Sequence, residues 1–149
     1  MLWCLNILYY VLILALIVLD QMSKTYAVLK LRDAFTLPVR LGIFKFIIVR
    51  NPGAAFGLMA KKQLLLKAVT LVLILLLLGY TTAMIVWGEP LLKILSLTFI
   101  TGGAFGNFID RFRLNHVIDF ISLNIKGFPV FNLADLFIFS GCVLYIAFF

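Results

Sequence analysis

The amino-acid sequence predicts an all-α membrane protein with four transmembrane helices and a small β-platform between the first and second of them. Three observations support this fold class. Of the 149 residues, 64% are hydrophobic and 13% are charged, whereas a soluble domain is nearer one half apolar and one quarter charged. The mean hydropathy is +1.17. Four segments approach the roughly 20 apolar residues that are needed to cross the hydrocarbon core of a bilayer.

The four apolar segments predict a single domain over residues 1–149. The spans are expected at about residues 3–19, 64–87, 91–112 and 130–149. The first has the length of a signal peptide but lacks a basic n-region and an Ala-x-Ala-like cleavage site, so it is interpreted as a retained span. Gly88-Glu89-Pro90 predicts a tight turn. The second and third spans are therefore expected to be antiparallel neighbours.

The segment between the first two spans is long enough to need structure of its own. Phe35–Arg40 and Ile43–Arg50 are β-like runs around a short break, a pattern that predicts an antiparallel hairpin. Asn51-Pro52-Gly53 is a strong turn signal that returns the chain toward the membrane. We expect a β-platform over about residues 35–58, lying on the bilayer surface. The aromatic side chains expected to hold it there are Phe44, Phe46 and Phe56.

Antiparallel connectivity brings polar residues from distant parts of the sequence to one membrane face. The end of the first span, the start of the second, the end of the third and the start of the fourth share that face. A carboxylate within a membrane span costs roughly 2.5–3.5 kcal/mol even on lenient scales, so acids in this region indicate function. Glu89 lies on the opposite face. The residues expected to converge are Asp20, Asn51, Asn107, Asp110, Arg111, Asp119, Asn132 and Asp135.

The basic residues bear on partners and orientation. A net charge of +7 would suggest nucleic acid for a soluble protein, but here it favours anionic lipid head groups and an interfacial substrate. No nucleic-acid partner is expected. All but one of the 13 lysines and arginines lie on the acid-rich face, and the exception is Lys93. Taken alone, the positive-inside rule therefore places the acid-rich face in the cytoplasm.

Asp119 and Asp135 are the candidates for catalysis. Asp119 lies just beyond the third span and Asp135 about one turn into the fourth, and a loop containing Gly127 and Pro129 can bring them together. Adjacent carboxylates cannot both ionise cheaply, so such a pair holds one proton between its members. One member can activate a water while the other protonates the scissile carbonyl or the leaving amine. Pairing of each acid with a basic residue, to fix helix packing, is an equally weighted alternative.

Neighbouring polar residues could support either explanation. Asn107 and Arg111 share one helical face at i, i+4 and are interpreted as substrate-facing. Arg111 could stabilise an oxyanion or simply neutralise an acid. Asp110 is expected to have a positioning and structural role. Asn132 could hydrogen-bond the second candidate acid or a substrate amide. Asn51 could be a site residue or only a turn former.

The remaining features are interpreted structurally. Asp20 and Lys24 are expected to form an interfacial i, i+4 pair that anchors the first span. The small residues within 102–106 indicate close helix packing, although they could also admit a substrate. His116 has no second metal ligand at a suitable spacing, so no metal or cofactor is expected. Both cysteines lie in apolar runs and are interpreted as small hydrophobic residues.

Five short motifs follow one another along the chain. They are Asp20–Lys24, Arg50–Gly57, Gly102–Arg111, Val117–Phe120 and Phe131–Asp135. In this order they resemble the motifs of the bacterial lipoprotein signal peptidases (type II signal peptidases), over nearly the whole length of the chain. Each motif is weak alone, but five in order on a four-span chain are highly specific.

The resemblance implies an intramembrane aspartic endopeptidase. Such enzymes remove the signal peptide from bacterial prolipoproteins by cleaving before a diacylglyceryl-modified cysteine. By this likeness Asp119 and Asp135 are the catalytic pair. The residues implied to bind substrate or support the site are Asn51, Asn107, Arg111, Asn132 and Ala134. Those implied to be structural polar residues are Asp20, Lys24 and Asp110.

The resemblance also implies a location and partners. The protein would be a multi-pass protein of the bacterial cytoplasmic (inner) membrane, with its site near the outer face, opposite to the orientation that the charge count predicts. Its partners would be a diacylglyceryl-modified prolipoprotein and membrane lipid, and we expect a monomer. A small transporter or proton-coupled channel is the competing hypothesis, because membrane-embedded acids also relay protons. A structural membrane subunit, in which all six acids tolerate replacement by Asn, is a third.

Overall fold

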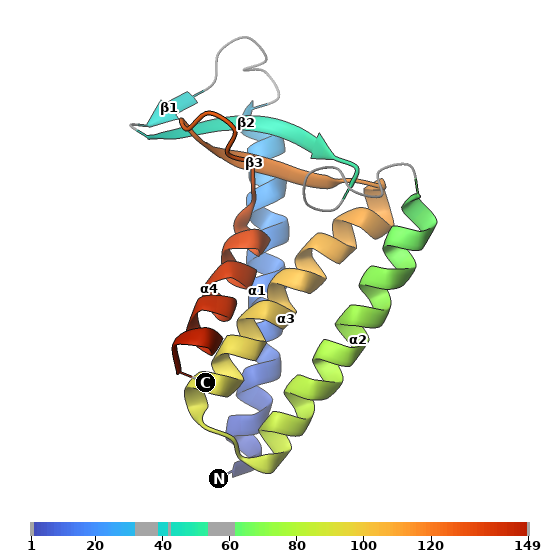
Figure 1. Ribbon diagram of the computed structural model, residues 1–149, viewed down its shortest axis with the longest axis vertical. Coiled ribbons are helices and arrows are strands. Elements are labelled where there is room, and N and C mark those ends of the chain that lie inside the picture. The colour runs from blue at the N-terminus through green and yellow to red at the C-terminus, as the bar shows by residue number, and fades with distance from the viewer. Residues whose placement is uncertain (1, 32–38, 42, 54–61, 149) are drawn as a thin grey trace.

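The computed structural model describes residues 2–31, 39–41, 43–53 and 62–148. Within these residues the chain forms helices and a three-stranded sheet (Figure 1). The helices are α1 (Leu2–Leu31), α2 (Gln63–Trp87), α3 (Leu91–Leu114) and α4 (Leu133–Phe148). The strands are β1 (Val39–Leu41), β2 (Phe44–Asn51) and β3 (Val117–Leu123).

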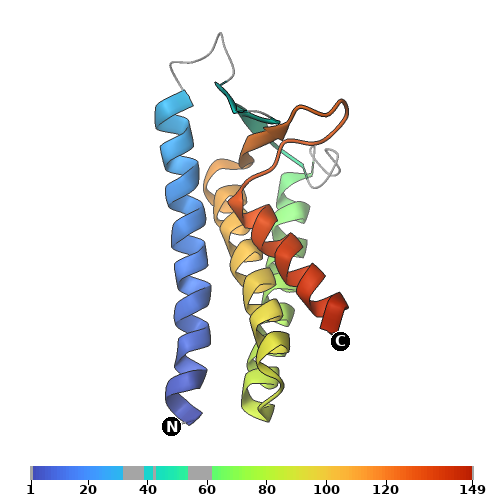
Figure 2. The ribbon, with the colours of Figure 1, turned by 90° about the vertical axis from the view of Figure 1, so that its left-hand side faces the viewer.

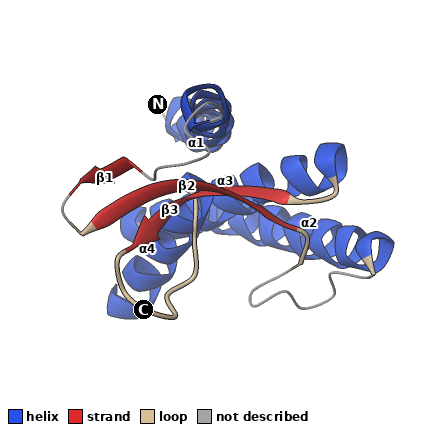
Figure 3. Cartoon of the chain, turned by 90° about the horizontal axis from the view of Figure 1, so that it is seen from above, coloured by secondary structure: helices blue, strands red, loops and turns tan. Residues whose placement is uncertain are grey.

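Helix α3 is the centre of the bundle. It packs against α1, α2 and α4, and α1 also packs against α4. Figures 1 and 2 show the sheet at one end of the helices, opposite to the end that holds the turn between α2 and α3. Seen from above, the strands lie across the ends of the helices (Figure 3). The end of α1 and the start of α4 are thereby gathered at the sheet end of the bundle (Figures 1 and 2).

The predicted fold class is confirmed. The helices within 6–31, 63–87 and 91–114 are long and apolar enough to cross a membrane. Helix α1 runs on to Leu31 instead of ending near residue 19, and α4 is a shorter apolar helix of 16 residues. Helix α4 begins at Leu133 instead of residue 130, because Phe131 is held in an antiparallel bridge with Ile121.

The turn between α2 and α3 is confirmed where the sequence predicts it. Gly88 adopts a left-handed conformation with φ 70°, which a glycine takes without steric cost. Its N–H donates to the carbonyl of Ile85, and the N–H of Glu89 donates to that of Met84. These bonds satisfy carbonyls that the end of α2 leaves free. Pro90 then precedes the first residue of α3.

The sheet has the antiparallel order β1-β2-β3. Strands β1 and β2 form the predicted hairpin, with Val39 opposite Phe46. Residues 35–38, 42 and 54–58 of the predicted platform, with Phe56, lie outside the described residues. Phe44 is exposed and Phe46 is partly buried, and their contact with a bilayer stays a prediction. The third strand was not predicted, since residues 113–129 were expected to form a loop.

Glycines allow α3 to lie close to its neighbours. A Cβ atom at Gly103 would overlap the backbone carbonyl of Ala134 on α4. A Cβ atom at Gly106 would lie 2.5 Å from Oδ2 of Asp20 on α1. Both contacts support the helix-packing interpretation of this small-residue stretch. They also bring α1 and α4 together at the level of the acids.

Candidate active site

Asp119 and Asp135 lie on different elements that the chain brings together. Asp119 is on β3, and Asp135 is in the first turn of α4. The N–H of Phe131 donates to the carbonyl of Ile121, and the N–H of Ile121 donates back, both at 2.8 Å. This bridge returns the loop to β3 just before α4 begins. The start of α4 is therefore held beside the strand that carries Asp119.

Asn132 links the two acids. Its Nδ2 atom donates to Oδ1 of Asp119 at 2.7 Å, and its backbone N–H donates to Oδ2 of Asp135 at 3.2 Å. Its Oδ1 atom accepts the backbone N–H of Asp135 at 3.0 Å. The last two bonds form a reciprocal cap on the first turn of α4.

Asn51 binds the other carboxylate oxygen of Asp119. Its Nδ2 atom donates to Oδ2 of Asp119 at 3.2 Å, and its Oδ1 atom accepts the backbone N–H of Gly53 at 3.1 Å. The second bond makes the turn that the sequence predicts. Asn51 therefore forms the predicted turn and also contacts the candidate acid Asp119, and its role in a site stays a prediction.

The environment of Asp119 favours its protonated form. Only 3% of the residue is exposed. Burial and the nearby charge of Asp135 raise the pKa of Asp119 from 3.8 to about 6, against the opposing effect of the bonds from Asn51 and Asn132. A carboxyl group with such a pKa is partly protonated near pH 6 and can release its proton during a reaction.

Asn107 on α3 joins this network from below the sheet. Its Nδ2 atom donates to Oδ1 of Asp135 at 2.7 Å. Its Oδ1 atom accepts from Nδ2 of Asn132 at 3.0 Å and from Nζ of Lys24 at 3.1 Å. Asn107 thus connects Asp135 to a second group of charged residues on α1 and α3.

That second group is centred on Lys24. The predicted pair with Asp20 is present, with Nζ and Oδ2 at 2.8 Å, but it is buried inside the bundle instead of interfacial. Nζ also lies 2.9 Å from Oδ2 of Asp110. Asp20 in addition accepts the backbone N–H of Ala134 at 3.0 Å. The pair was expected at the interface because the first span was expected to end near residue 19, whereas α1 continues past Lys24.

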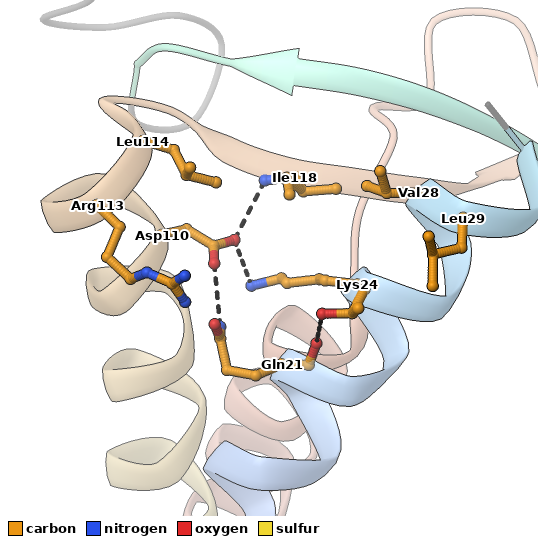
Figure 4. A pocket seen from close by; sticks show the side chains of 9 residues that line it. Gln21, Lys24, Val28, Leu29, Asp110, Arg113, Leu114 and Ile118 are labelled. Carbon is orange, nitrogen blue, oxygen red and sulfur yellow. Dashed lines mark hydrogen bonds and ion pairs between the residues drawn. The ribbon is translucent and has the colours of Figure 1, made fainter.

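Gln21 belongs to the same group, although sequence reasoning gave it no role. Its Nε2 atom donates to Oδ1 of Asp110 at 3.0 Å. Asp110 also accepts the backbone N–H of Ile118, so α1, α3 and β3 meet at this carboxylate (Figure 4). The position of Gln21 next to Asp20 in the first motif is the signal that could have identified it. A cavity of about 200 Å³ lies beside this group, and Lys24, Asp110 and Arg113 are among its lining residues (Figure 4).

Arg111 does not form an ion pair with either candidate acid. Its Nη2 atom lies 3.5 Å from the carbonyl oxygen of Gly53, and its Nε atom is buried with no partner among the described residues. In the part of the chain that the structure describes, no lysine or arginine forms an ion pair with Asp119 or Asp135. No cluster of metal-binding side chains occurs among the described residues either.

The fold and the site together define a multi-pass membrane protein with two carboxyl groups on either side of one asparagine. The sequence matches the family described as Signal peptidase (SPase) II over residues 12–149. The chain therefore belongs to the signal peptidase II family, a family of peptidases.

Relatives and solved structures agree with this assignment. The chain is 45% identical over 136 residues to a lipoprotein signal peptidase of Moorella thermoacetica, covering 89% of this chain and 87% of the relative. It is 37% identical over 147 residues to one of Clostridioides difficile, covering 95% and 96%. A bacterial membrane enzyme solved by the in meso method at 2.3 Å matches with a TM-score of 0.76 and 27% identity, covering 93% of this chain and 85% of that one.

Proposed function

We propose that the protein is an intramembrane aspartic endopeptidase that removes the signal peptide from bacterial prolipoproteins, cutting before the diacylglyceryl-modified cysteine. The observation that carries this proposal is the placement of Asp119 and Asp135 around Asn132, with neither acid in an ion pair with a described lysine or arginine. The packing-only alternative requires such ion pairs. The names of the relatives support the substrate.

The two acids have different environments and are assigned different roles. Asp119, with its pKa near 6, supplies a proton to the scissile carbonyl oxygen. Asp135 accepts a proton from the attacking water, and its carboxylate oxygens are held in place by Nδ2 of Asn107 and the backbone N–H of Asn132. Water adds to the carbonyl carbon and gives a diol. Asp135 then protonates the leaving nitrogen as the C–N bond breaks, and Asp119 recovers a proton from a diol hydroxyl.

Arg111 is assigned to the substrate backbone. Its cationic guanidinium has a buried Nε atom that lacks a partner among the described residues, and an unpaired buried donor is unfavourable. A carbonyl oxygen of an extended substrate would supply the missing acceptor. The weak bond from Nη2 to the carbonyl of Gly53, at 3.5 Å, leaves the guanidinium facing the loop that follows β2.

The proposed substrate shares the membrane with the enzyme. The helices expose many apolar side chains, for example Leu73, Leu76 and Phe139, that suit contact with lipid. The lipid chains of the substrate would stay in the bilayer, and confinement to two dimensions would supply much of the proximity that the reaction needs. We place the protein, as a monomer, in the bacterial cytoplasmic membrane, with the site near the outer face.

The test is cleavage of a diacylglyceryl-cysteine peptide by the full-length protein in detergent or lipid. The wild-type protein is expected to cut on the N-terminal side of the modified cysteine. Asp119→Asn and Asp135→Asn are each expected to abolish cleavage while helicity is retained. Cleavage by either variant at the wild-type rate would refute the catalytic assignment. Ion flux in proteoliposomes without any cleavage would favour the transporter hypothesis instead.

A further inference from the structure

Lys24 is a buried lysine whose hydrogen-bonding capacity is filled. Only 2% of its side chain is exposed. Its ammonium group has three hydrogens and no acceptor, and Nζ has three close oxygen atoms. Two belong to the carboxylates of Asp20 and Asp110, at 2.8 and 2.9 Å. The third is Oδ1 of Asn107, at 3.1 Å. Lys24 therefore contacts a residue that itself binds Asp135.

The bond from Lys24 determines which way the Asn107 amide points. Because an ammonium group can only donate, the amide atom that faces Nζ must be the oxygen. The Nδ2 atom then faces the other way, where it lies 2.7 Å from Oδ1 of Asp135. Nδ2 of Asn132 donates to the same Asn107 oxygen at 3.0 Å, in agreement with this orientation.

We propose that Lys24 is a positioning residue for peptide-bond hydrolysis: its ammonium group holds the amide of Asn107 so that Nδ2 points at the carboxylate of Asp135. The proposal rests on the function proposed above for Asp119 and Asp135. With the amide reversed, its oxygen would face the Asp135 carboxylate, and two acceptors would repel one another. Lys24 itself does not contact the reacting atoms.

A purely structural role is the alternative. Lys24 would then serve only to neutralise Asp20 and Asp110, which are 0% and 3% exposed. Loss of one partner leaves a buried charge uncompensated, so Lys24→Met alone is destabilising under either explanation. The single variant therefore cannot separate the two roles.

A double variant separates them. Lys24→Met/Asp20→Asn removes one positive and one negative charge together. Asp110 keeps its bonds from Gln21 at 3.0 Å and from the backbone N–H of Ile118 at 3.2 Å. The amide oxygen introduced at position 20 can still accept the N–H of Ala134. The summed charge of the group returns to that of wild type, although Asp110 is left without a cation. The Asn107 amide likewise has no cation to orient it.

The experiment measures kcat and KM for a diacylglyceryl-cysteine peptide with full-length wild-type protein, both Lys24 variants and Lys93→Met. Misplacement of a reacting group by about 1 Å can cost about 100-fold in rate, so kcat should fall about 100-fold in both Lys24 variants while KM changes less than about threefold. The double variant should melt at a higher temperature than Lys24→Met, because one buried carboxylate instead of two is left without its cation. Lys93→Met removes an i, i+4 pair with Glu89 at the other end of α3 and should keep wild-type kcat.

Wild-type kcat in the double variant would overturn the proposal, because charge neutralisation alone would then suffice. Wild-type kcat in Lys24→Met would overturn it as well. A different result identifies failure of the proposed function: the wild-type protein does not cleave the peptide, or Asp119→Asn cleaves it equally well. In that case the positioning role proposed for Lys24 is refuted together with the proposed function.

Discussion

The side-chain amide of Asn132 lies 2.7 Å from the carboxylate of Asp119, while its backbone N–H binds the carboxylate of Asp135. One residue thus caps α4 and sets the relative position of two acids from separate elements. The cap and the link to Asp119 use different atoms, Oδ1 and Nδ2. Substitutions at this position can therefore separate stability from activity.

Asn132→Ser is expected to keep the cap and lose most of the activity. A serine hydroxyl is an effective cap acceptor, so the melting temperature should stay near wild type. The Nδ2 bonds to Asp119 and Asn107 are lost. The value of kcat should fall about 100-fold, because Asp119 and Asp135 are no longer held in their relative positions. Asn132→Ala is the matched control and should in addition lose about 1 kcal/mol of stability. Equal activity of Asn132→Ser and wild type would contradict the linking role.

The pH dependence of activity should report Asp119. If Asp119 must donate a proton, kcat/KM falls as pH rises through about 6, the pKa set by burial and by Asp135. The measurement is a pH–rate profile of the full-length protein with a lipidated peptide whose own groups do not titrate in this range. A profile that is flat between pH 5 and about 8 would exclude Asp119 as the proton donor.

The same shift makes a prediction for stability. The folded protein binds more protons at Asp119 than the unfolded chain between pH 3.8 and about 6, because the pKa is raised on folding. The contribution of Asp119 to the free energy of unfolding is therefore fully present below pH 3.8 and is lost as pH rises through about 6. The total loss is about 3 kcal/mol. Plotted against pH, the free energies of unfolding of wild type and Asp119→Asn should diverge over that interval and run parallel above it. Plots that are parallel at every pH would contradict the raised pKa of Asp119.

The convergence of the polar residues could be predicted from the sequence because it depends on connectivity alone. Spans joined by a tight turn at Gly88 must be antiparallel, and this places Asp119, Asp135 and Asn107 at one end whatever the detailed packing.

Strand β3 could not be predicted with equal ease, although Val117–Leu123 is rich in β-branched and aromatic residues. Its strand identity comes from pairing with β2, about 70 residues earlier in the chain, and β-propensity is decided by such partners.

The environment of Lys24 shows a second limit. Spacing predicts its pair with Asp20, since i, i+4 neighbours share a helix face. Spacing gives no information on what covers that face. The burial of the pair follows from Gly106, whose missing side chain lets the Asp20 carboxylate lie against α3, and from Asp110, which supplies a second acid. Such contacts between helices depend on their rotation and depth, which one sequence does not determine.

Gly103→Ala is expected to destabilise the bundle. The added methyl group would meet the backbone carbonyl of Ala134, which cannot move aside as a flexible side chain could. Overpacking of this kind costs about 1–3 kcal/mol. Gly79→Ala on α2 is the matched control, because its methyl group would have no neighbour within 4 Å and should be neutral or slightly stabilising. Thermal unfolding in detergent measures both, and equal melting temperatures would contradict the close packing of α3 on α4.

The orientation of the site can be decided by cysteine labelling. Lys126 is exposed in the loop between β3 and α4, and Trp87 is exposed at the opposite end of the bundle, at the end of α2. Both variants are made in a background without the two native cysteines. Lys126→Cys should react with a membrane-impermeant maleimide added to spheroplasts. Trp87→Cys should react only after the cytoplasmic membrane is permeabilised. This result is expected because a secreted substrate must reach Asp119 and Asp135 from outside. The reverse pattern would support the orientation predicted by the positive-inside rule. It would also place the acids on the side of the membrane that the proposed substrate has left.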